Sequence, residues 1–199
     1  MKDALIIFTR NPELGKCKTR LAKTIGDEAA LHVYKHLLNH TAKVAREVPA
    51  ERYVFYSENI IEDDIWDSRF FKKQLQAGCD LGERMHNAFK YLFLKGFEKV
   101  VIIGSDLLDL DKHHIQDAFQ KLNEFDVVLG PAKDGGYYLL GMKKNHPIIF
   151  KNKSWGSSSV RKDTLHDLKE VDVFLLETLN DIDTFEDAKH YKELKPYYQ

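Results

Sequence analysis

Short apolar stretches alternate with amphipathic segments along the whole chain, and this alternation constrains the fold more than any other feature of the sequence. Residues 4–8 are apolar, in a run too short for a helix, which predicts a buried strand. Further strands are predicted at residues 53–56, 73–76, 100–103, 127–129, 137–140 and 171–175. Strands separated by helices build βαβ units, so the sequence predicts an α/β fold with a mainly parallel sheet, as one domain over residues 1–199. No helix fits between 127–129 and 137–140, which predicts an antiparallel pairing there.

The helices are predicted from apolar residues that recur three or four positions apart. They cover residues 27–48, 81–95, 112–122, 157–168 and 184–194, with a short additional helix at 60–66. Asp80 with Glu83 is typical of a capping box, and Asp111 and Thr184 are typical helix N-caps. Residues 10–25 contain turn signals and are expected to form a loop.

The composition excludes several classes of protein. The chain carries 30 Lys and Arg against 31 Asp and Glu, and this balance gives no reason to expect nucleic-acid binding. No apolar run is long enough to span a membrane, and the first residues lack the longer apolar core of a signal peptide. Two cysteines, Cys17 and Cys79, cannot form a disulfide framework, so we expect a cytoplasmic protein with reduced thiols.

The near-neutral total hides a strongly basic segment after the first predicted strand. Five basic residues and one acid lie between positions 10 and 23. Ligands bind at the carboxyl ends of parallel strands, where backbone N–H groups and cations of such a loop suit phosphate groups. The P-loop motif is excluded, because Cys17 follows Gly15-Lys16 and Arg10 stands where its first glycine should be. A solvated basic loop is the alternative interpretation.

Acidic residues follow two later strands. Asp106 comes immediately after the strand at 100–103, where a carboxylate is placed to hold Mg²⁺ on nucleotide phosphates. Asp181 and Asp183 lie two apart, so in an extended chain they point the same way, and Asp183 is a candidate to share a metal with Asp106. Helix capping and turn formation are the alternative explanations for such acids.

A third loop, after the strand at 127–129, combines a carboxylate, two glycines and tyrosines. Gly135-Gly136 allows close approach of backbone to a ligand, and Tyr137 offers stacking and a hydroxyl group. We expect this loop to contact substrate through Asp134, Gly135, Gly136 and Tyr137. An ordinary Asp-Gly turn is the alternative.

Taken together, these segments resemble the nucleotide-diphospho-sugar transferase superfamily with the GT-A fold. More narrowly, they resemble the rSAM/selenodomain-associated, or arsenosugar-biosynthesis-type, glycosyltransferases, and the basic segment is similar to that of 2-phospholactate guanylyltransferase. The matching stretches lie in order at residues 12–21, 76–85, 104–106, 130–138 and 181–184. The family usually has proline where this chain has Leu108, which puts the geometry of that loop in question.

The resemblance implies a three-layer α/β sandwich with a GT-A-type sheet, and a Mg²⁺ or Mn²⁺ cofactor. Catalytic roles are implied for Asp106 and Asp134, and metal ligation for Asp106 with Asp183. Phosphate or nucleotide contacts are expected at Arg10, Gly15, Lys16, Lys18, Arg20 and Ser105.

Three functions remain open from the sequence. The first is glycosyl transfer from a nucleotide-diphospho-sugar to a small acceptor. The second is nucleotidylyl transfer from a nucleoside triphosphate to a phosphorylated small molecule, with release of pyrophosphate. The positive charge of residues 10–23 slightly favours this function, because a nucleoside triphosphate is the larger anion. The third is a non-catalytic nucleotide-binding protein, for which Leu108 is the only hint. No side chain is identified as a general base.

Overall fold

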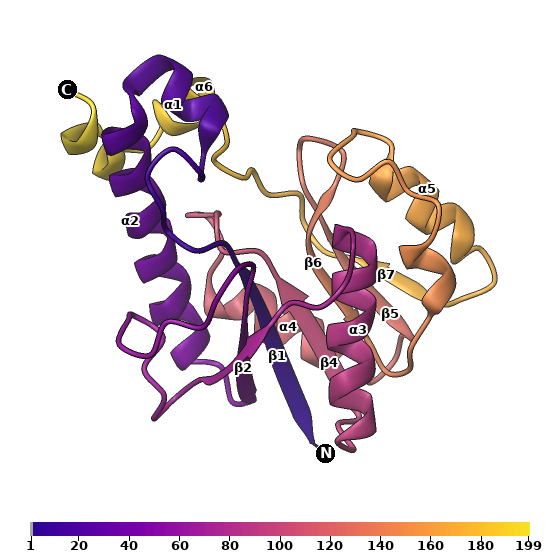
Figure 1. Ribbon diagram of the computed structural model, residues 1–199. Helices are drawn as coiled ribbons and strands as arrows, with labels where there is room; N and C mark the ends of the chain where they lie inside the picture. Colours follow the sequence, from indigo (N-terminus) through magenta and orange to yellow (C-terminus); the bar gives the residue numbers. More distant parts are fainter. Residues whose placement is uncertain (1) are drawn as a thin grey trace.

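A seven-stranded sheet forms the centre of the protein, and the computed structural model describes residues 2–199 (Figure 1). The strands are β1 (Asp3–Thr9), β2 (Glu51–Tyr56), β3 (Lys72–Leu75), β4 (Lys99–Ile103), β5 (Val127–Pro131), β6 (Tyr137–Met142) and β7 (Val173–Leu175). Their order across the sheet is β3-β2-β1-β4-β6-β5-β7. Only β6 runs antiparallel to its neighbours β4 and β5, while every other pairing is parallel. The predicted α/β class, the mainly parallel sheet and the antiparallel pairing are confirmed.

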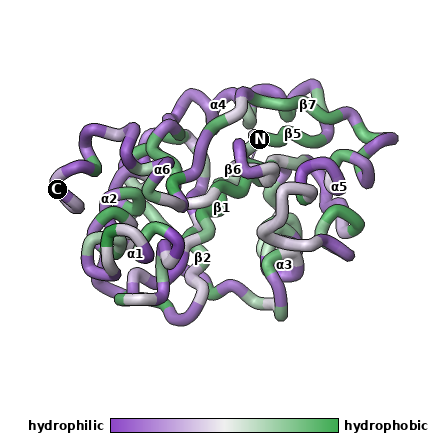
Figure 2. The backbone as a smooth tube through the Cα atoms, turned by 90° about the horizontal axis from the view of Figure 1, so that it is seen from above, coloured by the Kyte–Doolittle hydropathy of each residue, from purple (hydrophilic) through white to green (hydrophobic). Residues whose placement is uncertain are grey.

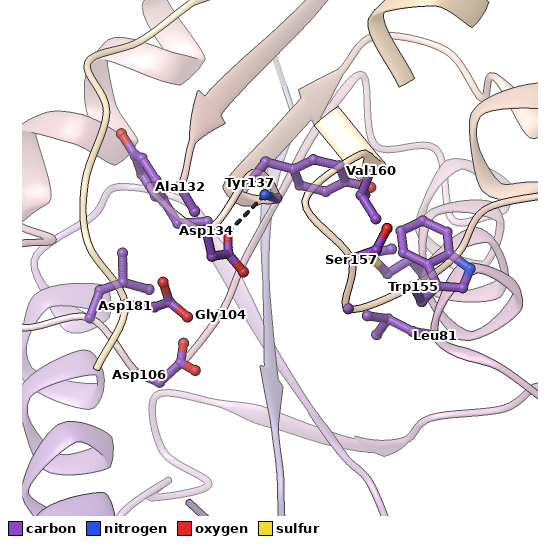
Figure 3. Close-up of a pocket in the computed structure, with 15 residues that line it drawn as sticks. Leu81, Gly104, Asp106, Ala132, Asp134, Tyr137, Trp155, Ser157, Val160 and Asp181 are labelled. Carbon is purple, nitrogen blue, oxygen red and sulfur yellow. Dashed lines mark hydrogen bonds between the residues drawn. The ribbon is translucent and has the colours of Figure 1, made fainter. Parts of the chain in front are cut away.

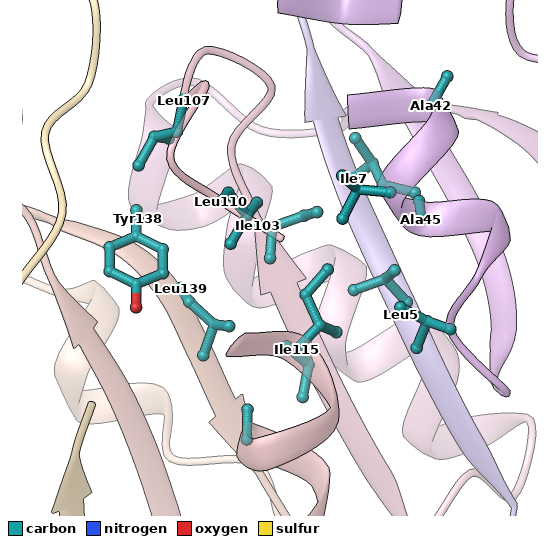
Figure 4. Close-up of a cluster of buried hydrophobic side chains, with 14 of the residues drawn as sticks. Leu5, Ile7, Ala42, Ala45, Ile103, Leu107, Leu110, Ile115, Tyr138 and Leu139 are labelled. Carbon is teal, nitrogen blue, oxygen red and sulfur yellow. The ribbon is translucent and has the colours of Figure 1, made fainter. Parts of the chain in front are cut away.

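The helices form the two outer layers of the predicted three-layer sandwich. They are α1 (Thr19–Ile25), α2 (Asp27–Arg46), α3 (Leu81–Leu94), α4 (Lys112–Lys121), α5 (Val160–Asp167) and α6 (Phe185–Ala188), with 3-10 turns at Pro147–Phe150 and Lys192–Tyr197. Because side chains alternate across a strand, Leu5 and Ile7 of β1 face α2 and α4, while Ala4 and Ile6 face α3. Figure 4 shows the first of these cores, and in Figure 2 the central strands are mainly hydrophobic.

Three predictions about helices are wrong. Residues 10–25 are not all loop, because α1 forms at Thr19–Ile25; with seven residues and Leu21 alone fully buried, it is too short to show a helical period. The helix expected at 60–66 is absent, and bends held by the Lys73 ammonium on two backbone carbonyls replace it. The final helix stops at Ala188, and a 3-10 turn containing Pro196 follows.

The predicted helix caps are largely confirmed. The Asp80 carboxylate accepts a bond from the Glu83 amide, but the Glu83 carboxylate accepts from the Cys79 amide, so the reciprocal half of the capping box is displaced by one residue. Asp111 and Thr184 both cap their helices, each with a complete capping box.

The loops that the sequence singled out gather at one edge of the sheet. Strands β1, β4 and β5 all end there, and the antiparallel β6 begins there. The segments that follow Thr9, Ile103 and Pro131 therefore meet above the sheet, together with the chain that leads from β7 to α6 (Figure 1). This edge positions the candidate site.

Candidate functional site

A cavity of about 210 Å³ opens at this edge of the sheet, and its two sides differ in chemistry. Asp106, Asp134 and Asp181 lie on one side, and Trp155 and Leu81 lie on the other (Figure 3). The polar side is built from the loop after β4, the loop between β5 and β6, and the chain before α6. The fold therefore brings these three carboxylates together at the ends of the strands.

Asp106 is held in a well-anchored loop. Leu107 and Leu110 on the same loop are each 1% exposed, and the backbone carbonyl of Asp106 accepts a 3.1 Å bond from the Ile182 amide. Ser105 is buried just before it. These contacts anchor the loop, although Leu108 stands where the family usually has proline.

The Asp134 carboxylate lies on a tight turn that packs against the chain before α5. Its Oδ1 accepts a 2.7 Å bond from the Gly136 amide. Gly135 has a φ of +94°, and a Cβ there would lie 2.3 Å from the Ser158 carbonyl oxygen, so only glycine fits. Gly136 and Tyr137 line the cavity, as expected for substrate contacts, whereas Gly135 serves the close packing of the turn.

Asp181 is the site residue that the sequence-based prediction left without a role. Burial raises its pKa to about 6, and the negative charges of Asp106 and Asp134 add to the effect. Ile182 beside it is fully buried, so the neighbouring acids at 181 and 183 point away from the core. The alternation of a buried residue between two acids was the available signal.

Lys18 places a cation between the carboxylates. Its ammonium lies 2.9 Å from Asp106 Oδ2 and 3.8 Å from Asp183 Oδ1, and its side chain is 6% exposed. Burial alone would lower the pKa of Lys18, but the Asp106 carboxylate, with a smaller contribution from Asp183, more than offsets this and the pKa is raised. Its backbone has a φ of +49°, an uncommon conformation for a non-glycine residue and one that clusters at functional sites.

Asp183 lies among cations. Arg20 forms a 3.0 Å ion pair with Asp183 Oδ2, and Lys18 approaches the other oxygen. The cavity-lining acid of this segment is Asp181. The geometry thus favours Asp181 over Asp183 as a partner of Asp106, and metal ligation by Asp183 stays a prediction.

The rest of the basic loop is exposed and fixed at its base. Lys16 pairs with Glu13 at 2.6 Å, Gly15 has a φ of +74°, and Arg10 is exposed. Asn11 is buried and donates from its side-chain amide to the Asn59 carbonyl at 2.8 Å. Of the predicted phosphate contacts, Arg10, Gly15 and Lys16 therefore lie on the exposed part of this loop, while Ser105 is buried on the loop after β4. The role of all of them stays a prediction.

The described residues meet the requirements of neither a preformed metal site nor a membrane-spanning helix. Within residues 2–199, no three His, Cys, Asp or Glu side chains are arranged as a preformed metal cluster. Over the same residues, none of the helices combines the length and apolarity needed to cross a bilayer. Both thiols are free, and Cys17 is buried.

The fold matches proteins of the nucleotide-diphospho-sugar transferase class. A crystal structure of a protein from Desulfovibrio desulfuricans G20, described as a nucleotide-diphospho-sugar transferase, is 31% identical, with a TM-score of 0.88 over 98% of this chain and 89% of that one. A cytidylyltransferase from Leptospira borgpetersenii has a TM-score of 0.64 at 15% identity over 100% of this chain and 88% of that one, which supports the fold alone.

Residues 40–157 match the model of the DUF2064 family, described as uncharacterized proteins conserved in bacteria, and the chain belongs to this family. It is also similar to 2-phospho-L-lactate guanylyltransferases. The enzyme of Methanocaldococcus vulcanius is 28% identical over 151 residues, which are 74% of this chain and 64% of that protein. That of Methanocaldococcus jannaschii is 27% identical over 141 residues, 69% of this chain and 59% of the other. The chain thus spans less than two thirds of these relatives. The predicted resemblances to nucleotide-diphospho-sugar transferases and to 2-phospholactate guanylyltransferases are confirmed.

Proposed function

We propose that the protein is a metal-dependent enzyme that transfers a sugar from a nucleotide-diphospho-sugar to a small acceptor. The observation that carries this proposal is the convergence of Asp106, Asp134 and Asp181 in one cavity beside a basic loop, at the sheet edge where such folds bind ligands. The 31% identity to a protein described as a nucleotide-diphospho-sugar transferase supports it. We also propose that the protein works in the cytoplasm, where its two thiols stay reduced.

A divalent cation fits the charge of the site. The raised pKa of Asp181 reflects burial and the nearby Asp106 and Asp134 carboxylates, and a bound cation would relieve this repulsion. Mg²⁺ and Mn²⁺ prefer oxygen ligands, and Mg²⁺ commonly takes one or two protein carboxylates with phosphate oxygens and water, so no preformed cluster of three is needed. We assign Asp106 and Asp181 as ligands. When bound, the cation would offset the charge that grows on the leaving phosphate.

The basic loop supplies the second source of positive charge. Lys18 lies beside Asp106, so its ammonium is next to the place where donor phosphates would meet the carboxylates. Arg20 is held by Asp183 at the mouth of the same region. Arg10 is exposed on this loop and can approach an anion from solvent, whereas the exposed Lys16 is paired with Glu13.

We assign Asp134 as the group that accepts the proton of the acceptor hydroxyl. With Oδ1 bound to the Gly136 amide, Oδ2 is the oxygen that remains for an acceptor hydroxyl. In the proposed step, the acceptor oxygen forms a bond to the anomeric carbon of the sugar. The bond from that carbon to the diphosphate breaks, its electron pair leaves with the nucleoside diphosphate, and the hydroxyl proton passes to Asp134.

Nucleotidylyl transfer is the second candidate, favoured by the likeness to guanylyltransferases over 151 residues. There an acceptor phosphate would attack the α-phosphorus of a nucleoside triphosphate, and pyrophosphate would leave. The loop cations weigh against it, because Lys16, Lys18 and Arg20 are each already paired with an acid. A triphosphate demands more unpaired positive charge than a diphosphate sugar does.

The two candidates release different products. Incubation with a panel of sugar nucleotides and nucleoside triphosphates plus Mg²⁺ should release a nucleoside diphosphate from a sugar nucleotide, and release of pyrophosphate would support the second candidate. Asp106→Asn should abolish the release. Asp109→Asn is the matched control, because Asp109 lies on the same loop but bonds to the Tyr191 hydroxyl. Failure to consume any donor would contradict an enzymatic function.

A further inference from the structure

The cavity lining carries no basic side chain, and the Lys18 ammonium beside it is already paired with the Asp106 carboxylate. Of the residues that line it, three are aspartates and none is Lys, Arg or His. Its opposite side carries the mainly apolar side chains of Leu81, Trp155 and Val160, with Ser157 beside Trp155 (Figure 3). Figure 3 shows Trp155 and Leu81 facing the side that carries Asp134 and Asp106. A molecule in this cavity therefore meets carboxylates on one face and hydrocarbon or indole on the other.

The indole wall is fixed by close packing. A Cβ at Gly82 would lie 2.5 Å from the Trp155 ring, so the indole lies directly against the backbone of α3. The opposite wall is tied to the same region, because the Gly135 carbonyl accepts a 3.0 Å bond from the Arg161 amide at the start of α5. Both walls are thus held by contacts within the protein itself, and the chemistry of their side chains determines which ligands fit.

Resting on the proposed function, we propose that the acceptor is an uncharged molecule with hydroxyl groups and one apolar ring face, and that phosphorylated acids are rejected. A buried anion without a partner is costly, and here it would face Asp134 as well as any carboxylate not covered by metal. Hydroxyl groups, in contrast, donate to carboxylates, and the apolar face of a ring stacks on an indole.

The volume agrees with a molecule of about one ring. The cavity of about 210 Å³ is smaller than the ~300–1,000 Å³ of sites for drug-sized ligands. The acceptor hydroxyl would approach Asp134 Oδ2, and the ring would lie against Trp155. The acceptor class thus separates this protein from enzymes whose acceptor carries a phosphate.

Trp155 provides a direct reporter of this binding. The only other tryptophan, Trp66, is 1% exposed and packs on Phe71, so a ligand in the cavity reaches Trp155 alone. The experiment measures quenching of tryptophan fluorescence by neutral hydroxylated ring compounds, each paired with its own phosphate ester, for example glucose with glucose 6-phosphate and inositol with inositol phosphate. It is run with and without Mg²⁺. Trp155→Phe serves as the control for signal from elsewhere.

We expect the neutral member of a pair to bind at least about tenfold more tightly than its phosphate ester, since each added charge meets like charges at short range. Asp134→Asn should narrow this difference, and Asp109→Asn, outside the cavity, should not. Tighter binding of the phosphate esters, quenching that persists in Trp155→Phe, or no quenching by any neutral compound would each overturn the proposal. Fluorescence reports on the acceptor class without a donor. If the wild type consumes no donor, the proposed function is refuted independently of the inference about the acceptor.

Discussion

The Asp181→Asn variant should fold more stably than the wild type at neutral pH while losing activity. The pKa of Asp181 stands at about 6 instead of 3.8, a difference worth about 3 kcal/mol for a fully shielded group. Because part of this carboxylate reaches solvent, we halve the figure to about 1.5 kcal/mol. Asparagine keeps the shape and removes the charge, so the variant should gain roughly this amount.

The gain should depend on pH in a defined direction. A raised folded-state pKa means that the neutral acid stabilises the fold below the unfolded pKa, and this contribution is lost as the pH rises through about 6. Urea unfolding should therefore give equal free energies of unfolding for the two proteins near pH 4, and a difference of about 1.5 kcal/mol near pH 7.5.

A matched control separates this effect from a general gain on removing acids. Asp183→Asn removes the partner of Arg20 and should not raise the stability. Mg²⁺ together with a sugar nucleotide should stabilise the wild type more than Asp181→Asn. An Asp181→Asn variant that is less stable than the wild type at neutral pH would show that the Asp181 charge does not destabilise the fold.

Two further predictions concern the elements that hold the site. Gly135→Ala should cost about 2–4 kcal/mol, because its Cβ would overlap the Ser158 carbonyl at positive φ; Gly96→Ala, also at positive φ but with open space around it, should cost only about 1 kcal/mol in the same thermal unfolding assay. Lys18→Met should leave Asp106 without its cation, lower the stability by more than 1 kcal/mol and weaken binding of sugar nucleotides measured by calorimetry; unchanged binding would contradict the role of Lys18.

Much of the fold was predictable because the strands are continuous apolar runs. The run at 100–103 and its counterpart at 4–8 are buried on both faces, and such strands stand out from any helix by their length. The short α1 was not predictable, because its position depends on Leu21, Ala22 and Ile25 packing against α2 and against the C-terminal segment, which lies far away in the chain.

The site was predictable only in its outline. Asp106 and Asp134 follow apolar strands, and parallel topology brings strand ends together. The pairing of Lys18 with Asp106 was not predictable, because it depends on an 88-residue separation and on the left-handed backbone at Lys18. The sequence also did not distinguish Asp181, which lines the cavity, from Asp183, which faces Arg20, because this difference depends on tertiary contacts.

The central claim is that Asp106 and Asp181 together bind the divalent cation that carries the donor phosphates. Its most direct test is Mn²⁺ binding, measured by electron paramagnetic resonance with and without sugar nucleotides, for the wild type, Asp106→Asn, Asp181→Asn and the control Asp109→Asn. We expect a sugar nucleotide to strengthen Mn²⁺ binding to the wild type and to Asp109→Asn, and we expect Asp106→Asn and Asp181→Asn to lose Mn²⁺ binding. Undiminished Mn²⁺ binding by Asp181→Asn in the presence of the nucleotide would contradict this claim.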